Sequence, residues 1–139
     1  MSYQSYKDLD IYQIAQKLAI EIHHLSMELP KYELYEQGSQ IRRSSKSIVA
    51  NIVEGFGRRR YKKEFIQFLT YVLASCDETK EHIELLYKTG SFKDEILYNY
   101  FIQKYSELGR KVSNFIKAVV KAHNKYDLST GIRNHESGI

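Results

Sequence analysis

The sequence predicts an all-α protein that folds as an antiparallel up-down-up-down four-helix bundle. Apolar and small residues recur at alternating spacings of three and four along four long segments, as in helices that bury one face. The 139 residues include one Pro and seven Gly, too few turn residues for an all-β fold. The connections between the four segments are short, and short connections join antiparallel helices.

The first two helices are expected over about 10–29 and 33–55. Asp10 and Gln13 have the spacing of a capping box, and Pro30 should stop the first helix because the residue before a proline avoids the α region. Gly55 and Gly57 are expected to end the second helix with a left-handed cap. Their predicted buried seams are Ile11, Ala15, Leu18, Ile22, Leu25 and Leu29, and then Leu34, Gly38, Ile41, Ser45, Ile48, Ile52 and Gly55.

The third and fourth helices are expected over about 62–89 and 93–125, with Gly90 closing the third and Ser91 capping the fourth. The bundle should therefore form one domain over 1–125. Residues 126–139 lack periodicity and are expected to be a disordered tail. The predicted seams are Phe65, Phe68, Leu69, Val72, Cys76, Thr79, Ile83 and Leu86, and then Leu97, Phe101, Tyr105, Leu108, Val112, Phe115, Val119 and Ala122.

A soluble cytoplasmic protein without membrane contact is expected. The N-terminus lacks the apolar stretch of a signal peptide, and no apolar run approaches the ~18 residues of a membrane span. The single cysteine, Cys76, rules out an intrachain disulfide and fits a reducing compartment. It is interpreted as an inert core residue.

Positive charge is concentrated between residues 42 and 63, a window with eight basic residues and one acid, Glu54, whereas the rest of the chain has a net charge of −3. This asymmetry indicates an anionic partner, and the alternative is a solvated charged helix end. Phe56, Tyr61 and Phe65 are interleaved with the cations, as in single-strand nucleic-acid binders. The candidate nucleic-acid-binding residues are Arg42, Arg43, Lys46, Arg58, Arg59, Arg60, Lys62 and Lys63.

Part of this cluster has a structural alternative. Arg42 or Arg43 could pair with an acid of the third helix, for which Glu78 is the candidate, and Glu54 stands four residues before Arg58, the favourable order for a helical ion pair. Asn51 and Glu54 are interpreted as structural or subunit-contact residues rather than catalytic ones. No catalytic residue, metal site or cofactor is predicted, and the acids around His82 are interpreted as a solvated face.

Apolar residues outside the four seams suggest a homo-oligomer, and the alternative is a wide core stripe with scattered exposed tyrosines. These residues are Ile14, Ala19, Val49, Val53, Tyr71, Leu73, Leu85, Tyr87, Tyr98, Tyr100, Ile116 and Val120.

The segment from Gln40 to Arg58, QIRRSSKSIVANIVEGFGR, resembles the motif of a four-helix-bundle family encoded by intervening sequences of bacterial large-subunit ribosomal RNA genes. Lys7-Asp8-Leu9, Leu29-Pro30, and Ser75 with Glu78 also match, so the resemblance covers about residues 5–123. Val53 and Ala74 depart from the pattern by small changes of volume. The residues carried over as a structural or oligomer motif are Asn51, Glu54, Gly55, Ser75 and Glu78.

The resemblance implies a bacterial homopentamer, and a related group resembles nucleic-acid-binding accessory proteins of diversity-generating retroelements. We therefore expect a non-enzymatic, homo-oligomeric bundle that binds nucleic acid, RNA rather than DNA, through its basic surface. The alternative is a scaffold whose basic patch docks an acidic protein partner, such as a reverse transcriptase or ribosome-associated factor. Fold analogy alone does not fix function.

Overall fold

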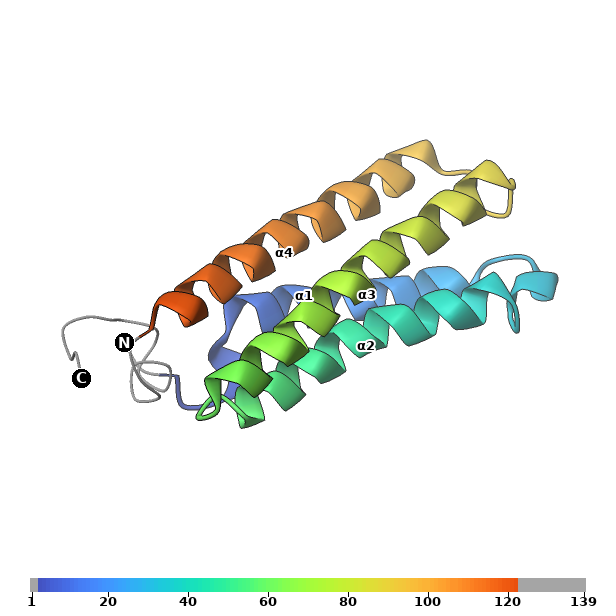
Figure 1. The fold of residues 1–139 in the computed structure, drawn as a ribbon. Coiled ribbons are helices and arrows are strands. Elements are labelled where there is room, and N and C mark those ends of the chain that lie inside the picture. The colour runs from blue at the N-terminus through green and yellow to red at the C-terminus, as the bar shows by residue number, and fades with distance from the viewer. Residues whose placement is uncertain (1–2, 123–139) are drawn as a thin grey trace.

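The computed structural model describes residues 3–122, which form an antiparallel four-helix bundle (Figure 1). The long helices are α1 (Asp10–Met27), α2 (Gln37–Gly57), α3 (Lys62–Lys88) and α4 (Glu95–Lys121). Two short 3-10 helices, η1 (Tyr6–Asp8) and η2 (Lys31–Glu33), precede α1 and α2. Successive helices run in opposite directions and pack side by side, most extensively α2 on α3, and the contact between α1 and α4 is smaller than those between successive helices. The predicted fold class is confirmed.

The predicted seams form the core. Leu25, Leu29, Leu34, Phe68, Leu97 and Phe115 are half-buried, and the other predicted seam residues are buried. The largest of these is Tyr105, whose burial raises the pKa of its phenol. Its hydroxyl has no hydrogen-bond partner among residues 3–122. The 3-4 spacing thus identified the buried side of every helix.

The beginnings of the helices differ from the prediction. The capping box lies one turn early: Ser5 Oγ accepts from the Lys7 amide at 3.1 Å, and Asp8 Oδ2 accepts from the Ser5 amide at 3.1 Å. Leu9 is the N-cap of α1 and makes no side-chain cap bond, so the predicted Asp10–Gln13 box is wrong. The box forms at Asp8 because η1 places the Asp8 carboxylate beside the backbone amides of Gln4 and Ser5.

The linker between α1 and α2 meets the linker between α3 and α4 at the other end of the bundle. There α2 begins at Gln37, rather than near residue 33 as predicted. The buried Glu33 carboxylate accepts from Ser91 Oγ at 2.5 Å and from the Gln37 amide at 3.2 Å. Ser91 is therefore not the cap of α4, as was predicted. Asp94 has that role and accepts from the Leu97 amide at 3.0 Å.

The glycines at the end of α2 also act differently. Within the described part of the chain, Gly90 is the glycine with positive φ, 84°, and it ends α3 as predicted. Gly55 lies inside α2 and permits close packing, because a Cβ there would stand 3.0 Å from Phe68 Cβ on α3. The predicted left-handed cap at Gly55 and Gly57 is therefore wrong.

A polar seam of five residues continues this contact between α2 and α3. Ser47 Oγ lies 3.1 Å from Ser75 Oγ, and Thr79 Oγ1 lies 2.8 Å from Ser44 Oγ. Asn51 Nδ2 donates to the carbonyl and hydroxyl oxygens of Ser47 at 2.9 and 3.0 Å. Small hydroxyl side chains therefore let the two helices approach closely while leaving these polar atoms paired.

The predicted tail at 126–139 lies outside the described residues, as do the last residues of the predicted 1–125 domain. Among the helices of residues 3–122, none combines the length and apolar character that crossing a bilayer requires.

We predict that Gly55→Leu lowers the free energy of unfolding by about 1–3 kcal/mol, because a side chain there must displace Phe68. Gly109→Ala is the matched control: no atom lies within 4 Å of the new Cβ in α4. It should raise stability by about 0.5–1 kcal/mol through helix propensity. Urea unfolding followed by circular dichroism measures both, and a Gly55→Leu protein as stable as the parent would contradict the packing role.

We also predict that Cys76 is unreactive in the folded protein. Burial, and then the nearby Asp77, raises the pKa of its thiol from 9.0 to about 12. Unfolding exposes a thiol that ionises near pH 9, whereas the buried thiol stays protonated. Ionisation of Cys76 therefore lowers the free energy of unfolding as the pH rises from 9 to 12. A disulfide reagent at pH 8 should label Cys76 only in denaturant. Between pH 8 and 10.5 the parent should lose about 1–2 kcal/mol more stability than Cys76→Ala.

Candidate nucleic-acid interface

The basic window splits into two groups on the folded chain. Arg42, Arg43 and Lys46 lie on the first half of α2, and the second group begins at Arg58, directly after α2. Lys46 and Arg58 are twelve positions apart, which corresponds to roughly 18 Å along a helix. The two groups are therefore separate surfaces, although the sequence presents them as one window.

Arg42 has a structural role. Its guanidinium donates to Ser26 Oγ at 3.0 Å and to the Leu34 carbonyl at 2.7 Å, which ties α2 to the end of α1 and to the linker. The predicted pairing with Glu78 is wrong, because Glu78 instead lies 3.3 Å from His82 Nε2. Arg43 and Lys46 are exposed.

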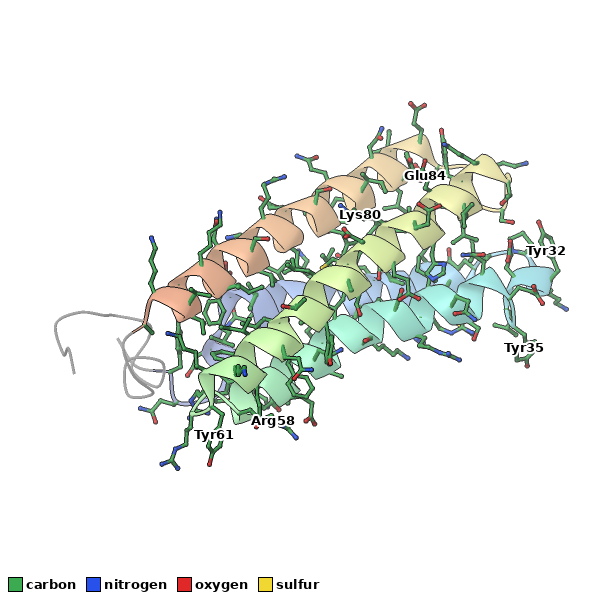
Figure 2. All side chains as sticks on the ribbon, viewed as in Figure 1. Tyr32, Tyr35, Arg58, Tyr61, Lys80 and Glu84 are labelled. Atoms are coloured by element: carbon green, nitrogen blue, oxygen red, sulfur yellow. The ribbon has the colours of Figure 1, made fainter. Side chains whose placement is uncertain are left out.

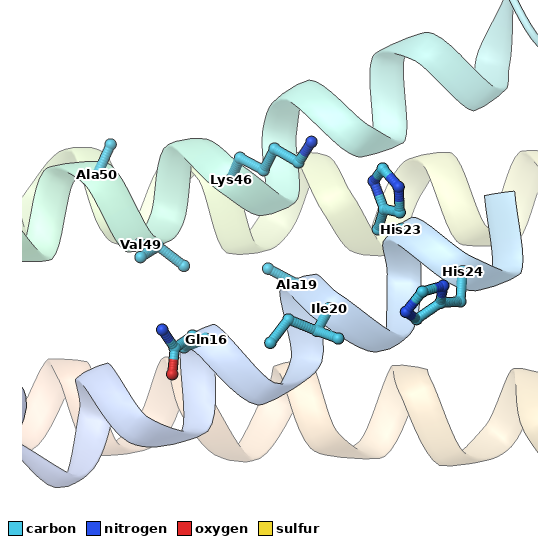
Figure 3. Close-up of a pocket in the computed structure, with 8 residues that line it drawn as sticks. All are labelled: Gln16, Ala19, Ile20, His23, His24, Lys46, Val49 and Ala50. Atoms are coloured by element: carbon cyan, nitrogen blue, oxygen red, sulfur yellow. The ribbon is translucent and has the colours of Figure 1, made fainter. Parts of the chain in front are cut away.

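Lys46 borders an open apolar groove of about 490 Å³ between α1 and α2 (Figure 3). Figure 3 shows its ammonium directed toward His23 of α1. Desolvation and then the Lys46 charge lower the pKa of His23, so its imidazole is neutral at pH 7 and adds no charge to this group. The apolar lining of the groove comes from Ala19, Ile20, Val49 and Ala50.

Two arginines at the turn between α2 and α3, Arg58 and Arg59, bind groups at the end of α2 and the start of α3. Arg58 contacts Glu54 at 2.5 Å, which confirms the predicted ion pair, and Glu64 at 3.2 Å. Arg59 lies 4.0 Å from the ring centre of Phe56, and its guanidinium donates to the Phe56 carbonyl at 2.9 Å. These contacts fix the geometry of the turn between the two helices.

Lys62 links this turn to the last helix. Its ammonium donates to the carbonyl of Ala122, the C-cap of α4, at 2.6 Å. The first turn of α3 therefore lies against the last turn of α4. This contact brings two exposed lysines of α4, Lys117 and Lys121, to the end of the bundle that carries the turn.

We call this region the basic end, and it contains cations that the sequence prediction did not assign to a site. The sequence signal was the antiparallel topology itself, which places the C-terminus of α4 beside that of α2. The nearby acids Glu54 and Glu64 both contact Arg58. The members of the basic end are Arg58, Arg59, Arg60, Lys62, Lys63, Lys117 and Lys121.

The opposite end of the bundle is acidic. In Figure 2 Arg58 and Tyr61 mark the basic end, and Tyr32 and Tyr35 mark the other. The four cations there, Lys31, Arg42, Lys88 and Lys93, are outnumbered by the six acids Glu28, Glu33, Glu36, Glu84, Asp94 and Glu95. The molecule is therefore electrically polar along its long axis.

The aromatics interleaved with the cations separate in the structure. Phe56 and Phe65 are 4% and 1% exposed and belong to the core. Tyr61 is 59% exposed and lies at the turn between Arg60 and Lys62. Of the three aromatics noted in the sequence, only Tyr61 offers its ring to a ligand.

The residues carried over from the family motif make contacts within the chain. Asn51 and Ser75 belong to the polar seam, and Gly55 packs against Phe68. Glu54 holds Arg58, and Glu78 lies beside His82. Over residues 3–122, no cluster of three or more His, Cys, Asp or Glu side chains is placed to hold a metal ion.

Comparison with known proteins places the chain in a family. A family model described as 23S rRNA-intervening sequence protein matches residues 7–114. A solved structure of a protein of unknown function, from the S23 ribosomal protein family of Bacteroides thetaiotaomicron, is similar with 27% identity and a TM-score of 0.66. The similarity covers 77% of this chain and 98% of that one. No curated protein matches. The matched model spans most of the sequence, and the chain belongs to the family of 23S rRNA-intervening sequence proteins.

Proposed function

We propose that the protein binds nucleic acid, RNA rather than DNA, through the basic end. The observation that carries the proposal is the gathering of four exposed cations, Arg60, Lys63, Lys117 and Lys121, from segments far apart in sequence. Of the acids at this end, Glu54 and Glu64 are paired with Arg58 and Asp10 with Lys111, and Asp8 accepts from the amides of Gln4 and Ser5. The family's association with a ribosomal RNA gene favours RNA over DNA.

The chemistry is binding without catalysis. Lysine and arginine side chains neutralise phosphates and release condensed counterions, which gives affinity that does not depend on base sequence. The charge of Arg58 is offset by Glu54 and Glu64, whereas Arg59, held by the Phe56 carbonyl, keeps its positive charge beside the exposed Arg60 and Lys63. Arg43 and Lys46 supply a second, weaker contact on α2.

We further propose that the bundle acts as a homo-oligomer, a pentamer by resemblance to the family. Most of the extra apolar residues found in the sequence pack against the core, among them Ile14, Val53, Leu73 and Ile116, so they do not support an interface. Support comes instead from the groove between α1 and α2, where Ile20 is 53% exposed. A ring would repeat the basic end and multiply weak contacts by avidity.

To test nucleic-acid binding, the three exposed charges Arg60, Lys63 and Lys121 are changed together to Gln. None of the three is a partner in the ion pairs and hydrogen bonds that fasten the turn. We expect the affinity for single-stranded RNA to fall by roughly tenfold or more, and the slope of log K against log salt to shrink by about 2. A filter-binding titration at several salt concentrations measures both.

The matched control removes the same charge from the acidic end by changing Lys31, Lys88 and Lys93 to Gln. Affinity and salt slope should then remain those of the parent. Equal binding by both triple variants would refute a nucleic-acid site at the basic end. If the parent does not bind RNA but does bind an acidic polypeptide, the result would favour protein docking instead.

The oligomer is tested by light scattering of the parent, Ile20→Asp and Ile96→Asp. The parent should have a mass five times 16.4 kDa. Ile20→Asp should lower it because a carboxylate would be desolvated in the groove. Ile96, 84% exposed on α4 and outside that groove, is the control, and its substitution should leave the mass unchanged. A parent mass of 16.4 kDa would exclude the oligomer.

A further inference from the structure

The turn that carries the exposed cations also presents an exposed aromatic residue, Tyr61, on a hydrogen-bonded backbone. The Tyr61 amide donates to the Arg58 carbonyl at 2.8 Å, and the Tyr61 carbonyl accepts from the Phe65 amide at 2.9 Å. The backbone of Tyr61 is thus fixed on both sides, as the N-cap of α3. The residue is 59% exposed, so an apolar ring face is open to solvent, and the ordered backbone leaves only the side-chain rotamer for a ligand to fix.

Further aromatic groups continue from Tyr61 along α3. Phe68 and Tyr71 pack edge to face with ring centres 5.6 Å apart, and the Arg58 guanidinium lies 4.8 Å from the Phe68 ring centre. Tyr71 is 44% exposed, and its hydroxyl accepts from Gln67 at 2.8 Å. Phe68 and Tyr71 are three residues apart on one side of α3, and Tyr61 is the N-cap of the same helix, roughly 10 Å before Phe68 along the axis.

Cations and aromatic faces therefore occur on the same surface, and each suits a different part of a nucleotide. Arg60 and Lys63 flank Tyr61 closely in sequence and are exposed, so their charges are available to phosphates while the ring meets a base. A base inside a duplex already has both faces stacked on its neighbours. A ring on the protein surface can stack only on a base that is unpaired or splayed out.

We propose that the basic end recognises unpaired nucleotides, with Tyr61 as the stacking platform that makes it prefer single strands to duplex. This inference rests on the proposed nucleic-acid function and names the form of nucleic acid that the site takes. Tyr71 and the guanidinium of Arg58 over Phe68 extend the platform toward neighbouring bases. Sequence preference is weak, because every base has a face that can stack.

Exposed tyrosines at the opposite end do not form such a site. Tyr32 and Tyr35 are 67% and 85% exposed, but they lie beside Glu28, Glu33 and Glu36, whose charges repel phosphates. Tyr35 is therefore the natural internal control for Tyr61: similar exposure and chemistry, opposite electrostatic surroundings.

The direct test uses the absence of tryptophan from the sequence. Tyr61→Trp and Tyr35→Trp each create a protein with one tryptophan, whose fluorescence is followed during titration with single-stranded RNA of about 12 nucleotides. Stacking on a base should quench the Trp at position 61 and protect it from iodide. The Trp at position 35 should show neither effect. Equal behaviour of the two proteins while RNA binds would overturn the stacking role.

The affinity test compares Tyr61→Ala with Tyr61→Phe on single-stranded RNA, single-stranded DNA and the fully paired RNA duplex. Tyr61→Ala should weaken binding to both single strands by roughly tenfold and leave duplex binding unchanged, whereas Tyr61→Phe keeps the ring and the parent's affinity. Equal parent affinities for strand and duplex, with no effect of Tyr61→Ala, would refute the preference for unpaired bases alone. Absence of binding to all three ligands would instead refute the proposed function itself.

Discussion

At Gly55 the backbone of α2 comes so near to α3 that a Cβ would stand 3.0 Å from that of Phe68, and the rest of the bundle is arranged around this contact. Between α2 and α3 a pair of hydroxyls, Ser47 and Ser75, takes the place of bulky apolar side chains. Dispersion contacts and paired polar atoms both favour the close approach. The contact sets the axial position of α3, and hence where the turn with its cations emerges.

The spacing of apolar residues was sufficient to predict the helices and their buried sides, because apolar residues three and four positions apart lie on one face of a helix, and that face is buried. It was insufficient where the partner of a residue is remote in sequence. Ser91 was expected to cap the next helix, but the carboxylate of Glu33 reaches it from the other linker. Gly55 was expected both on the buried seam and in a left-handed cap; the seam position is confirmed by its close approach to Phe68, and the cap is wrong. The contact of Glu33 with Ser91 leaves no periodic trace in the sequence, whereas Gly55 does belong to the 3-4 seam of the second helix.

The candidate site was predictable in part for the same reason. The charge window identified the turn between α2 and α3, and the helical ion pair of Glu54 with Arg58 followed from spacing alone. Two features needed the fold. The Arg42 guanidinium donates hydrogen bonds to Ser26 and to the Leu34 carbonyl, so this residue mainly stabilises the fold. Lys117 and Lys121 join the site only because α4 returns to the same end.

Some cations of the basic end stabilise the fold and others only face solvent, and this difference has an evolutionary consequence. Arg58, Arg59 and Lys62 each hold part of the scaffold, so substitution there is constrained by folding whatever the protein binds. Within residues 3–122, Arg60, Lys63, Lys117 and Lys121 make no such contact, so they can vary when the ligand changes. Homologues with different biological roles should therefore keep the first set and diverge at the second. The family can thus acquire new ligands without having to invent a new architecture.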